Sequence, residues 1–294
     1  RGMMPADGEA NRRAAPRHLL AAPLLLLLTP SSAQPYQRPL IAVFSQDLPE
    51  GPPAPFSEVL HASYVKWVEG AGGLVVPIRR WDSEARVRKV MPLVDGLLLP
   101  GGGGAPTRAV RLAVSLALSP AHPGGPAPVW GTCLGFEWLM ELFSGDEGIL
   151  REDLDAWNVS LPLDLTPAAE GSRLLGGRAN APLRAALATR PLTMNNHHAG
   201  VTPGAFHGHR LLNDTFAVLS TSTDRKGVRF VSTVEGRALP VWATQWHPEK
   251  AIYELGWRDG APAEAINHEG LAVGAAQHAA NHLVGLARAA ARTA

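Results

Sequence analysis

Short apolar runs alternate with amphipathic stretches through the first half of the chain. The runs at 40–44, 74–78 and 96–99 lie next to glycine or proline, which is typical of buried strands. Between the first two, apolar residues that include Tyr64 recur on one face of a helix over 60–71. Strands and helices in this rhythm predict an α/β fold, with a parallel sheet covered by helices on both faces.

The second half of the chain has a looser pattern. Residues 145–203 scatter Pro, Asn and Gly among short apolar clusters, so we expect mixed structure whose internal order is open. Strands resume at 230–234 and 241–246, which we expect to form a hairpin across 235–237. The alanine-rich end at 262–291 predicts a helix that packs back on the sheet.

Residues 1–33 have the pattern of a targeting leader rather than of a folded element. A basic stretch, an apolar run at 19–28 and a small-residue site at 29–33 follow the order of a secretory signal peptide. The run is shorter than the roughly 20 apolar residues that span a bilayer, so we expect no stable membrane insertion after cleavage. The alternative is a disordered leader on a cytosolic protein. We predict a mature domain over 34–294 in the secretory pathway, and then in the extracellular space, a lysosome or a vacuole.

Composition and charge bring two further expectations. The chain is 46% hydrophobic and 18% charged with a formal net charge of +1, so no basic surplus points to nucleic acid. N-glycosylation sequons begin at Asn158 and Asn213, in agreement with a secreted glycoprotein.

The chain has a single cysteine, Cys133, which cannot form an internal disulfide. A lone cysteine is by default a small buried residue, and it is a reactive thiol only with suitable neighbours. Here Gly131 and Gly135 flank it between a predicted strand and a predicted helix, the pattern of a nucleophile elbow. The helix N-terminus favours the thiolate, and the Leu134 N–H can donate to an oxyanion. We therefore predict that Cys133 is a nucleophile.

Two other segments follow predicted strands, at the carboxyl ends where active sites lie in parallel sheets. The glycines at 101–104 match neither the Walker nor the dinucleotide pattern. They are either a flexible spacer or a loop in which the Gly102 N–H completes the oxyanion hole. His247 and Glu249 follow the strand at 241–246. A loop histidine near an acid is usually a surface residue, but with a cysteine elbow it becomes a general base whose ring Glu249 orients.

The segments at 130–137, 100–102 and 245–250 together resemble the γ-glutamyl hydrolase (folylpoly-γ-glutamate hydrolase) family, within the class I glutamine amidotransferase-like superfamily. Gly-x-Cys-x-Gly with His-Pro-Glu marks the superfamily, and the residues flanking these motifs point to the family. The resemblance implies a three-layer α/β/α sandwich with a central mostly parallel sheet. It also implies a cofactor-free Cys-His mechanism without a metal, and frequent homodimers.

The resemblance further implies a small-molecule substrate, a poly-γ-glutamyl folate, cleaved through a γ-glutamyl thioester. His197 matches a second active-site histidine of the family. Glu137 and Lys250 are candidates for the groups that hold the α-amino and α-carboxyl groups of the substrate, with plain surface charge as the alternative. Two other functions stay open, namely a glutaminase domain that releases ammonia from glutamine and an inactive binding protein on the same scaffold.

Overall fold

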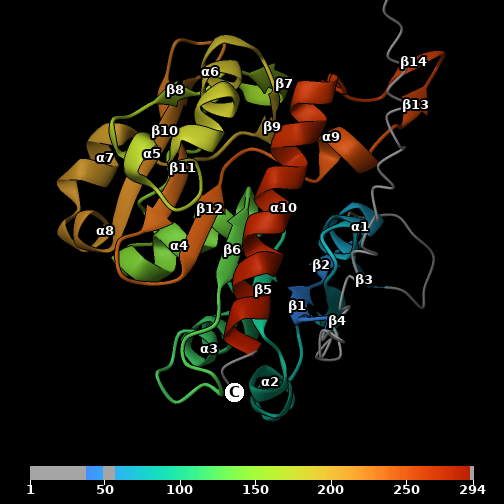
Figure 1. The fold of residues 1–294 in the computed structure, drawn as a ribbon, viewed down its shortest axis with the longest axis vertical. Coiled ribbons are helices and arrows are strands. Elements are labelled where there is room, and N and C mark those ends of the chain that lie inside the picture. Colours follow the sequence, from blue (N-terminus) through green and yellow to red (C-terminus); the bar gives the residue numbers. More distant parts are fainter. Residues whose placement is uncertain (1–37, 49–56, 292–294) are drawn as a thin grey trace, which may run out of the picture. The chain divides into compact units, whose positions relative to one another are not determined.

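The computed structural model describes residues 38–48 and 57–291, so the predicted signal peptide at 1–33 lies outside the described part. Its largest sheet has eight strands in the order β4-β1-β5-β6-β12-β11-β10-β8 (Figure 1). The strands from β4 to β12 are parallel, and the pairs that follow are antiparallel. In chain order they are β1 (Leu40–Phe44), β4 (Leu74–Ile78), β5 (Gly96–Leu99), β6 (Val129–Thr132), β8 (Asp164–Leu165), β10 (Phe216–Thr223), β11 (Arg229–Gly236) and β12 (Val241–Thr244).

The parallel half of the sheet comes from the apolar runs seen in the sequence. Every residue of β5, β6 and β12 is buried, because helices cover both faces of a parallel sheet. β4 lies at the edge, where Pro77 is tolerated because no further strand needs its missing N–H. The helices between and after these strands are α1 (Ala62–Gly70), α2 (Glu84–Val90), η1 (Met91–Leu93), α3 (Arg108–Ala117) and α4 (Leu134–Ser144).

The antiparallel half contains the predicted hairpin and two strands, β8 and β10, that the sequence did not reveal. β11 and β12 pair with Val234 opposite Ala243, as expected of the hairpin. β10 pairs along β11. Ser220 and Ser222 of β10 are almost fully buried, so the polar composition of its second half concealed a strand of the core.

The remaining elements surround the large sheet or form small ribbons of their own. The ribbons are β2 (Gln46–Asp47) with β3 (Glu58–Val59), β7 (Ala156–Leu161) with β9 (Thr193–His197), and β13 (Trp257–Arg258) with β14 (Ala261–Pro262). The helices are α5 (Ala168–Gly171), η2 (Arg178–Asn180), α6 (Ala181–Thr189), α7 (Pro203–Gly208), α8 (Arg210–Thr215), α9 (Lys250–Tyr253) and α10 (Gly270–Ala291). Across the described ranges, no helix is long and apolar enough to cross a membrane.

The core consists of two apolar layers separated by the sheet. Ile41 and Val43 of β1 pack into one layer, and Ala42 and Phe44 pack into the other, as the period of two along a strand requires. The first layer includes side chains of α1, α6, α9 and α10, and the second includes side chains of α2, α3, α4, α7 and α8. The architecture is therefore the expected α/β/α arrangement.

The C-terminal helix is shorter than predicted. Instead of starting near Pro262, α10 starts at Gly270, and Pro262 belongs to the β13–β14 hairpin. Asp259 and Gly260 both have positive φ, 51° and 81°, which is the conformation of a tight two-residue hairpin turn and suits an Asp-Gly pair. The Asp-Gly signal was therefore present in the sequence, and the alanine content that follows it obscured the turn.

Asn213, the first residue of the second sequon, has a structural role in this fold. Its Nδ2 donates to the backbone carbonyl oxygens of Phe206, His207 and His209 at 2.8 to 3.1 Å. These carbonyls lie at the end of α7, where a helix leaves its last acceptors without partners. A glycan on Nδ2 would leave one hydrogen for three acceptors, so glycosylation at Asn213 would compete with these hydrogen bonds.

We predict that Asn213→Ala lowers the free energy of unfolding by about 1–3 kcal/mol, because partly buried carbonyls lose their donor. Urea denaturation measures the change. Thr215→Ala is the matched control, since it removes the sequon and keeps the amide. If Thr215→Ala lowers the mass of secreted protein by one glycan, Asn213 is modified and its capping role is refuted.

Candidate active site

Cys133 lies on a strained turn between β6 and α4. Its backbone has φ 52° and ψ −105°, a conformation that non-glycine residues rarely adopt and that is concentrated at functional sites. Its N–H donates to the Thr244 carbonyl of the neighbouring strand at 2.8 Å, which fixes the turn to the sheet. The residue is 5% exposed. The predicted nucleophile-elbow geometry is therefore present.

The two glycines of the motif allow backbone to touch backbone. A Cβ on Gly131 would lie 2.5 Å from the Gly135 carbonyl oxygen, and one on Gly135 would overlap the Leu99 carbonyl oxygen. Real Cβ atoms do not approach so closely. Helix α4 can therefore begin directly against β5 and β6 only because both positions lack a side chain.

His247 follows β12 and is held from two sides. Its Nδ1 pairs with Glu249 Oε1 at 2.6 Å, and its backbone N–H donates to the Met194 carbonyl at 2.8 Å. Burial lowers the pKa of His247, but the charges of Glu249 and Cys133 and its hydrogen bonds to both outweigh burial and raise the pKa to about 10. The imidazole is consequently a cation at neutral pH and a suitable partner for a thiolate.

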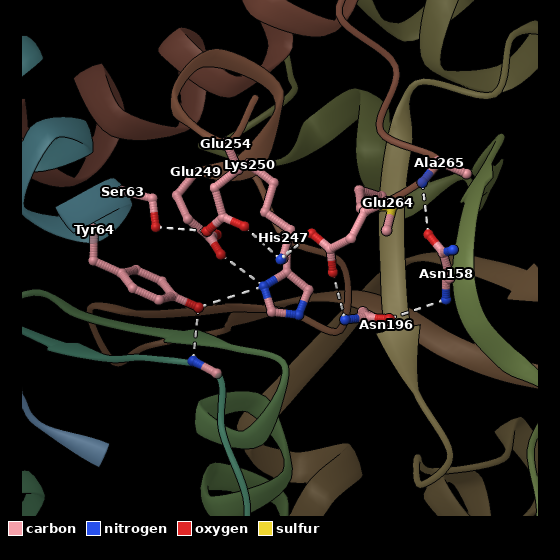
Figure 2. Close-up of polar contacts among 12 residues, drawn as sticks. Ser63, Tyr64, Asn158, Asn196, His247, Glu249, Lys250, Glu254, Glu264 and Ala265 are labelled. Atoms are coloured by element: carbon pink, nitrogen blue, oxygen red, sulfur yellow. Dashed lines mark hydrogen bonds and ion pairs between the residues drawn. The ribbon is translucent and has the colours of Figure 1, made fainter. Parts of the chain in front are cut away.

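Tyr64 connects this histidine to the glycine loop (Figure 2). Its hydroxyl accepts a hydrogen bond from the Gly101 N–H at 2.7 Å and lies 3.4 Å from His247 Nδ1. Burial, and the nearby charge of Glu249, raise the pKa of Tyr64 well above its usual value, so its hydroxyl stays protonated. The sequence identified Tyr64 only as part of an apolar helix face, because its partners come from distant segments.

The glycine loop is fixed rather than a flexible spacer. Arg80 is buried and donates to the carbonyl oxygens of Gly103 and Ala105, at 2.5 and 2.8 Å. A Cβ on Gly101 would lie 2.6 Å from His247 Cε1, and one on Gly102 would overlap Gln46. The loop backbone therefore lies directly beside the histidine and the thiol.

The five predicted residues Gly102, Cys133, His247, Glu249 and Lys250 line one cavity of about 340 Å³. Its remaining lining residues are His61, Tyr64, Gly101, Trp157, Asn196 and Glu254. Leu134 is not among the lining residues, but as the first residue of α4 its N–H has no earlier helical turn to donate to. The structure thus brings the predicted nucleophile Cys133, the predicted general base His247 and the carboxylate of Glu249 to one cavity.

Lys250 joins the cavity to an extended polar network. Its Nζ pairs with Glu254 Oε2 and with Glu264 Oε2, each at 2.6 Å. Asn196 Nδ2 donates to the other oxygen of Glu264, and Asn196 Oδ1 accepts from the Asn158 N–H. Figure 2 shows this row of side chains extending from the histidine toward β7. Lys250 is therefore buried in an ion-pair network at the wall of the cavity.

Two predicted substrate-binding residues, Glu137 and His197, are buried and are not among the lining residues of this cavity. Glu137 accepts a hydrogen bond from Gln245 at 2.9 Å, and burial raises its pKa to about 7. His197 Nδ1 donates to the Ala199 carbonyl at 2.7 Å, and burial lowers its pKa to about 3. The neighbouring residue Asn196, which the sequence did not single out as a contact residue, lines the cavity instead.

Comparison with known proteins assigns the family. The Peptidase C26 family profile matches residues 39–249, most of the chain. The chain belongs to the Peptidase C26 family. It is 34% identical over 255 residues to γ-glutamyl hydrolase B of Dictyostelium discoideum, in an alignment that covers 84% of this chain and 71% of that protein. It is 37% identical over 279 residues to γ-glutamyl hydrolase of Mus musculus (92% and 85% covered) and 38% identical over 234 residues to that of Homo sapiens (77% and 70% covered).

A solved structure supports the fold of this C26 chain. The glutaminase domain of Trypanosoma brucei CTPS with bound acivicin matches with a TM-score of 0.50 at 16% identity, covering 86% of this chain and 94% of that one. At this identity the likeness concerns the fold alone. Together with the relatives, it confirms the family resemblance and the α/β class inferred from the sequence.

We predict that Glu249→Gln moves the alkaline limb of the kcat/KM profile to lower pH. The negative charge of Glu249 helps to raise the pKa of His247, so its removal lowers that pKa, and the imidazolium is lost earlier as pH rises. The measurement is kcat/KM from pH 4 to about 11, a range that brackets this titration. Loss of activity should be smaller than for His247→Asn, for which about 10²- to 10⁴-fold is expected. An alkaline limb that stays in place would contradict the assigned coupling.

Proposed function

We propose that this chain is a cysteine hydrolase that cleaves γ-glutamyl amide bonds. The observation that carries the proposal is the arrangement of Cys133, His247 and Glu249 around one cavity, in which Glu249 pairs with the imidazole and helps to raise its pKa. A thiolate activated in this way is the nucleophile that acyl transfer requires. The names of the relatives, γ-glutamyl hydrolases over most of the chain, support the substrate class.

In the proposed reaction the Cys133 thiolate attacks the γ-carbonyl carbon of a glutamyl residue. The negative charge on the carbonyl oxygen is stabilised by the N–H groups of Leu134 and Gly102. His247 gives its proton to the departing α-amine, the C–N bond breaks, and a γ-glutamyl thioester remains on Cys133. Water then loses a proton to the same imidazole and attacks the thioester carbon, the C–S bond breaks, and the γ-carboxylic acid leaves while the thiolate is restored; the acid then loses its proton to the solvent.

The proposed role of Lys250 is to bind an α-carboxylate of the substrate. Its Nζ is already paired with Glu254 and Glu264, so a substrate carboxylate would share the ammonium rather than meet a free charge. The proposed roles of Glu137 and His197 are indirect, Glu137 through its hydrogen bond from Gln245 and His197 through its hydrogen bond to the Ala199 carbonyl. The proposed substrates are folylpoly-γ-glutamates and related γ-glutamyl peptides.

We predict that Cys133→Ala abolishes hydrolysis of a pteroyl-poly-γ-glutamate while the protein stays folded, because the thiol is one small side chain on a supported turn. Products are resolved by chromatography, and folding is followed by circular dichroism. In the wild type, an electrophilic γ-glutamyl analogue should add covalently to Cys133, seen by mass spectrometry. Activity above a few per cent in Cys133→Ala would show that another group is the nucleophile. Ammonia from glutamine without peptide cleavage would favour a glutaminase, and ligand binding without covalent addition would favour a binding protein.

The proposed location is the secretory pathway, on the basis of the leader at 1–33. We predict that protein secreted by a eukaryotic host begins near Gln34, because a signal peptidase removes the leader. N-terminal sequencing of secreted material tests this. A retained leucine run at 24–28 in the isolated protein would overturn the localisation and leave the chemistry unaffected.

A further inference from the structure

A second cavity of about 740 Å³ adjoins the cavity at Cys133. Trp157, Asn196 and Glu254 line both, so the two spaces meet at these side chains. The larger one extends along the segment 255–266 and the β13–β14 hairpin. The site described so far accounts for one glutamyl unit at the thiol and gives the larger space no role.

Trp157 is the notable residue at the junction because it is exposed and yet fixed in orientation. It is 49% exposed, and one face of its ring stacks on His198 with a centroid distance of 4.9 Å and an interplanar angle of 4°. Its carbonyl accepts from Arg225 Nη1 at 2.7 Å, and His198 Nδ1 donates to the Leu154 carbonyl. An exposed indole held flat in this way is preorganised to stack with a second ring.

The lining of the larger cavity favours an aromatic group over a chain of carboxylates. Trp257 lines it and is 71% exposed. The carboxylates Glu254 and Glu264 share the single positive charge of Lys250. Arg258 and His268 are the cationic or titratable basic residues of the lining. This balance contains no surplus of positive charge that would select a polyanion.

We propose that Trp157 is a stacking platform for an aromatic acyl group attached to the α-nitrogen of the glutamyl residue that is cleaved. The inference rests on the proposed function, since it assumes that this glutamyl residue is bound at Cys133. Because Trp157 lines both cavities, a group that extends from a substrate at the thiol into the larger cavity passes this side chain. Trp157 thereby acts as a specificity-determining residue that favours N-aroyl over N-alkanoyl substrates.

The test compares two ligands that share the scissile bond, N-(4-aminobenzoyl)-glutamyl-γ-glutamate and N-acetyl-glutamyl-γ-glutamate. Binding is measured by calorimetry in the Cys133→Ala background, with and without Trp157→Ala. We expect the preference for the aroyl ligand to fall on the order of fivefold in Trp157→Ala, and Trp157→Phe to retain most of it. Leu211→Ala, which removes an exposed side chain on α8, is the control and should leave the preference unchanged.

An unchanged preference in Trp157→Ala, or an equal loss of affinity for both ligands, overturns the platform. Hydrolysis of both ligands by the wild type separates this outcome from the proposed function. If the wild type cleaves both ligands but the preference for the aroyl ligand does not depend on Trp157, the stacking platform is refuted and the proposed hydrolase function stands. If the preference depends on Trp157 but the wild type cleaves neither ligand, the stacking platform stands and the proposed hydrolase function is refuted.

Discussion

The close contact of α4 with the sheet is the constraint on which the site depends. Gly131 lies against the backbone of Gly135, and Gly135 lies against the backbone of Leu99, so the helix begins without the spacing that side chains would impose. The chain turns from β6 into α4 through the strained, positive-φ conformation of Cys133. The same geometry presents the thiol above the sheet and leaves the Leu134 N–H at a helix N-terminus.

The second constraint is the parallel pairing of β6 with β12. Thr132 is opposite Thr244 in this register, so the residues that follow both strands emerge at the same edge of the sheet. Cys133 and His247 are distant in sequence, yet they meet because each comes just after the end of its strand. Tyr64 then connects the histidine to the glycine loop after β5, which joins α1, this loop and the segment after β12 into one site.

The sequence revealed those parts of the molecule whose signal is local. The apolar runs of β1, β4 and β5, the elbow around Cys133 and the His-Pro-Glu segment after β12 all carry their information within a few residues. β10 was missed because its serines and threonines resemble loop residues in the sequence, and only the packing of the folded chain shows that they are buried in the sheet. Tyr64 and Trp157 were missed as site residues for the same reason, since an aromatic side chain shows its role only through what it faces. Glu137 and His197 were assigned to the substrate site from their place in family motifs. A motif does not show whether a side chain lines the cavity or is buried elsewhere.

The conformation of Cys133 has a consequence for how such a protein can change over time. A residue with a Cβ pays an energetic penalty of roughly 1–3 kcal/mol in a sparsely populated backbone region, and glycine at this position would avoid it. The substitution that best relaxes the turn is therefore also the one that deletes the thiol. At this single position, selection for a more stable protein and selection for a reactive one act in opposite directions. A cysteine in this strained conformation therefore indicates selection for reactivity.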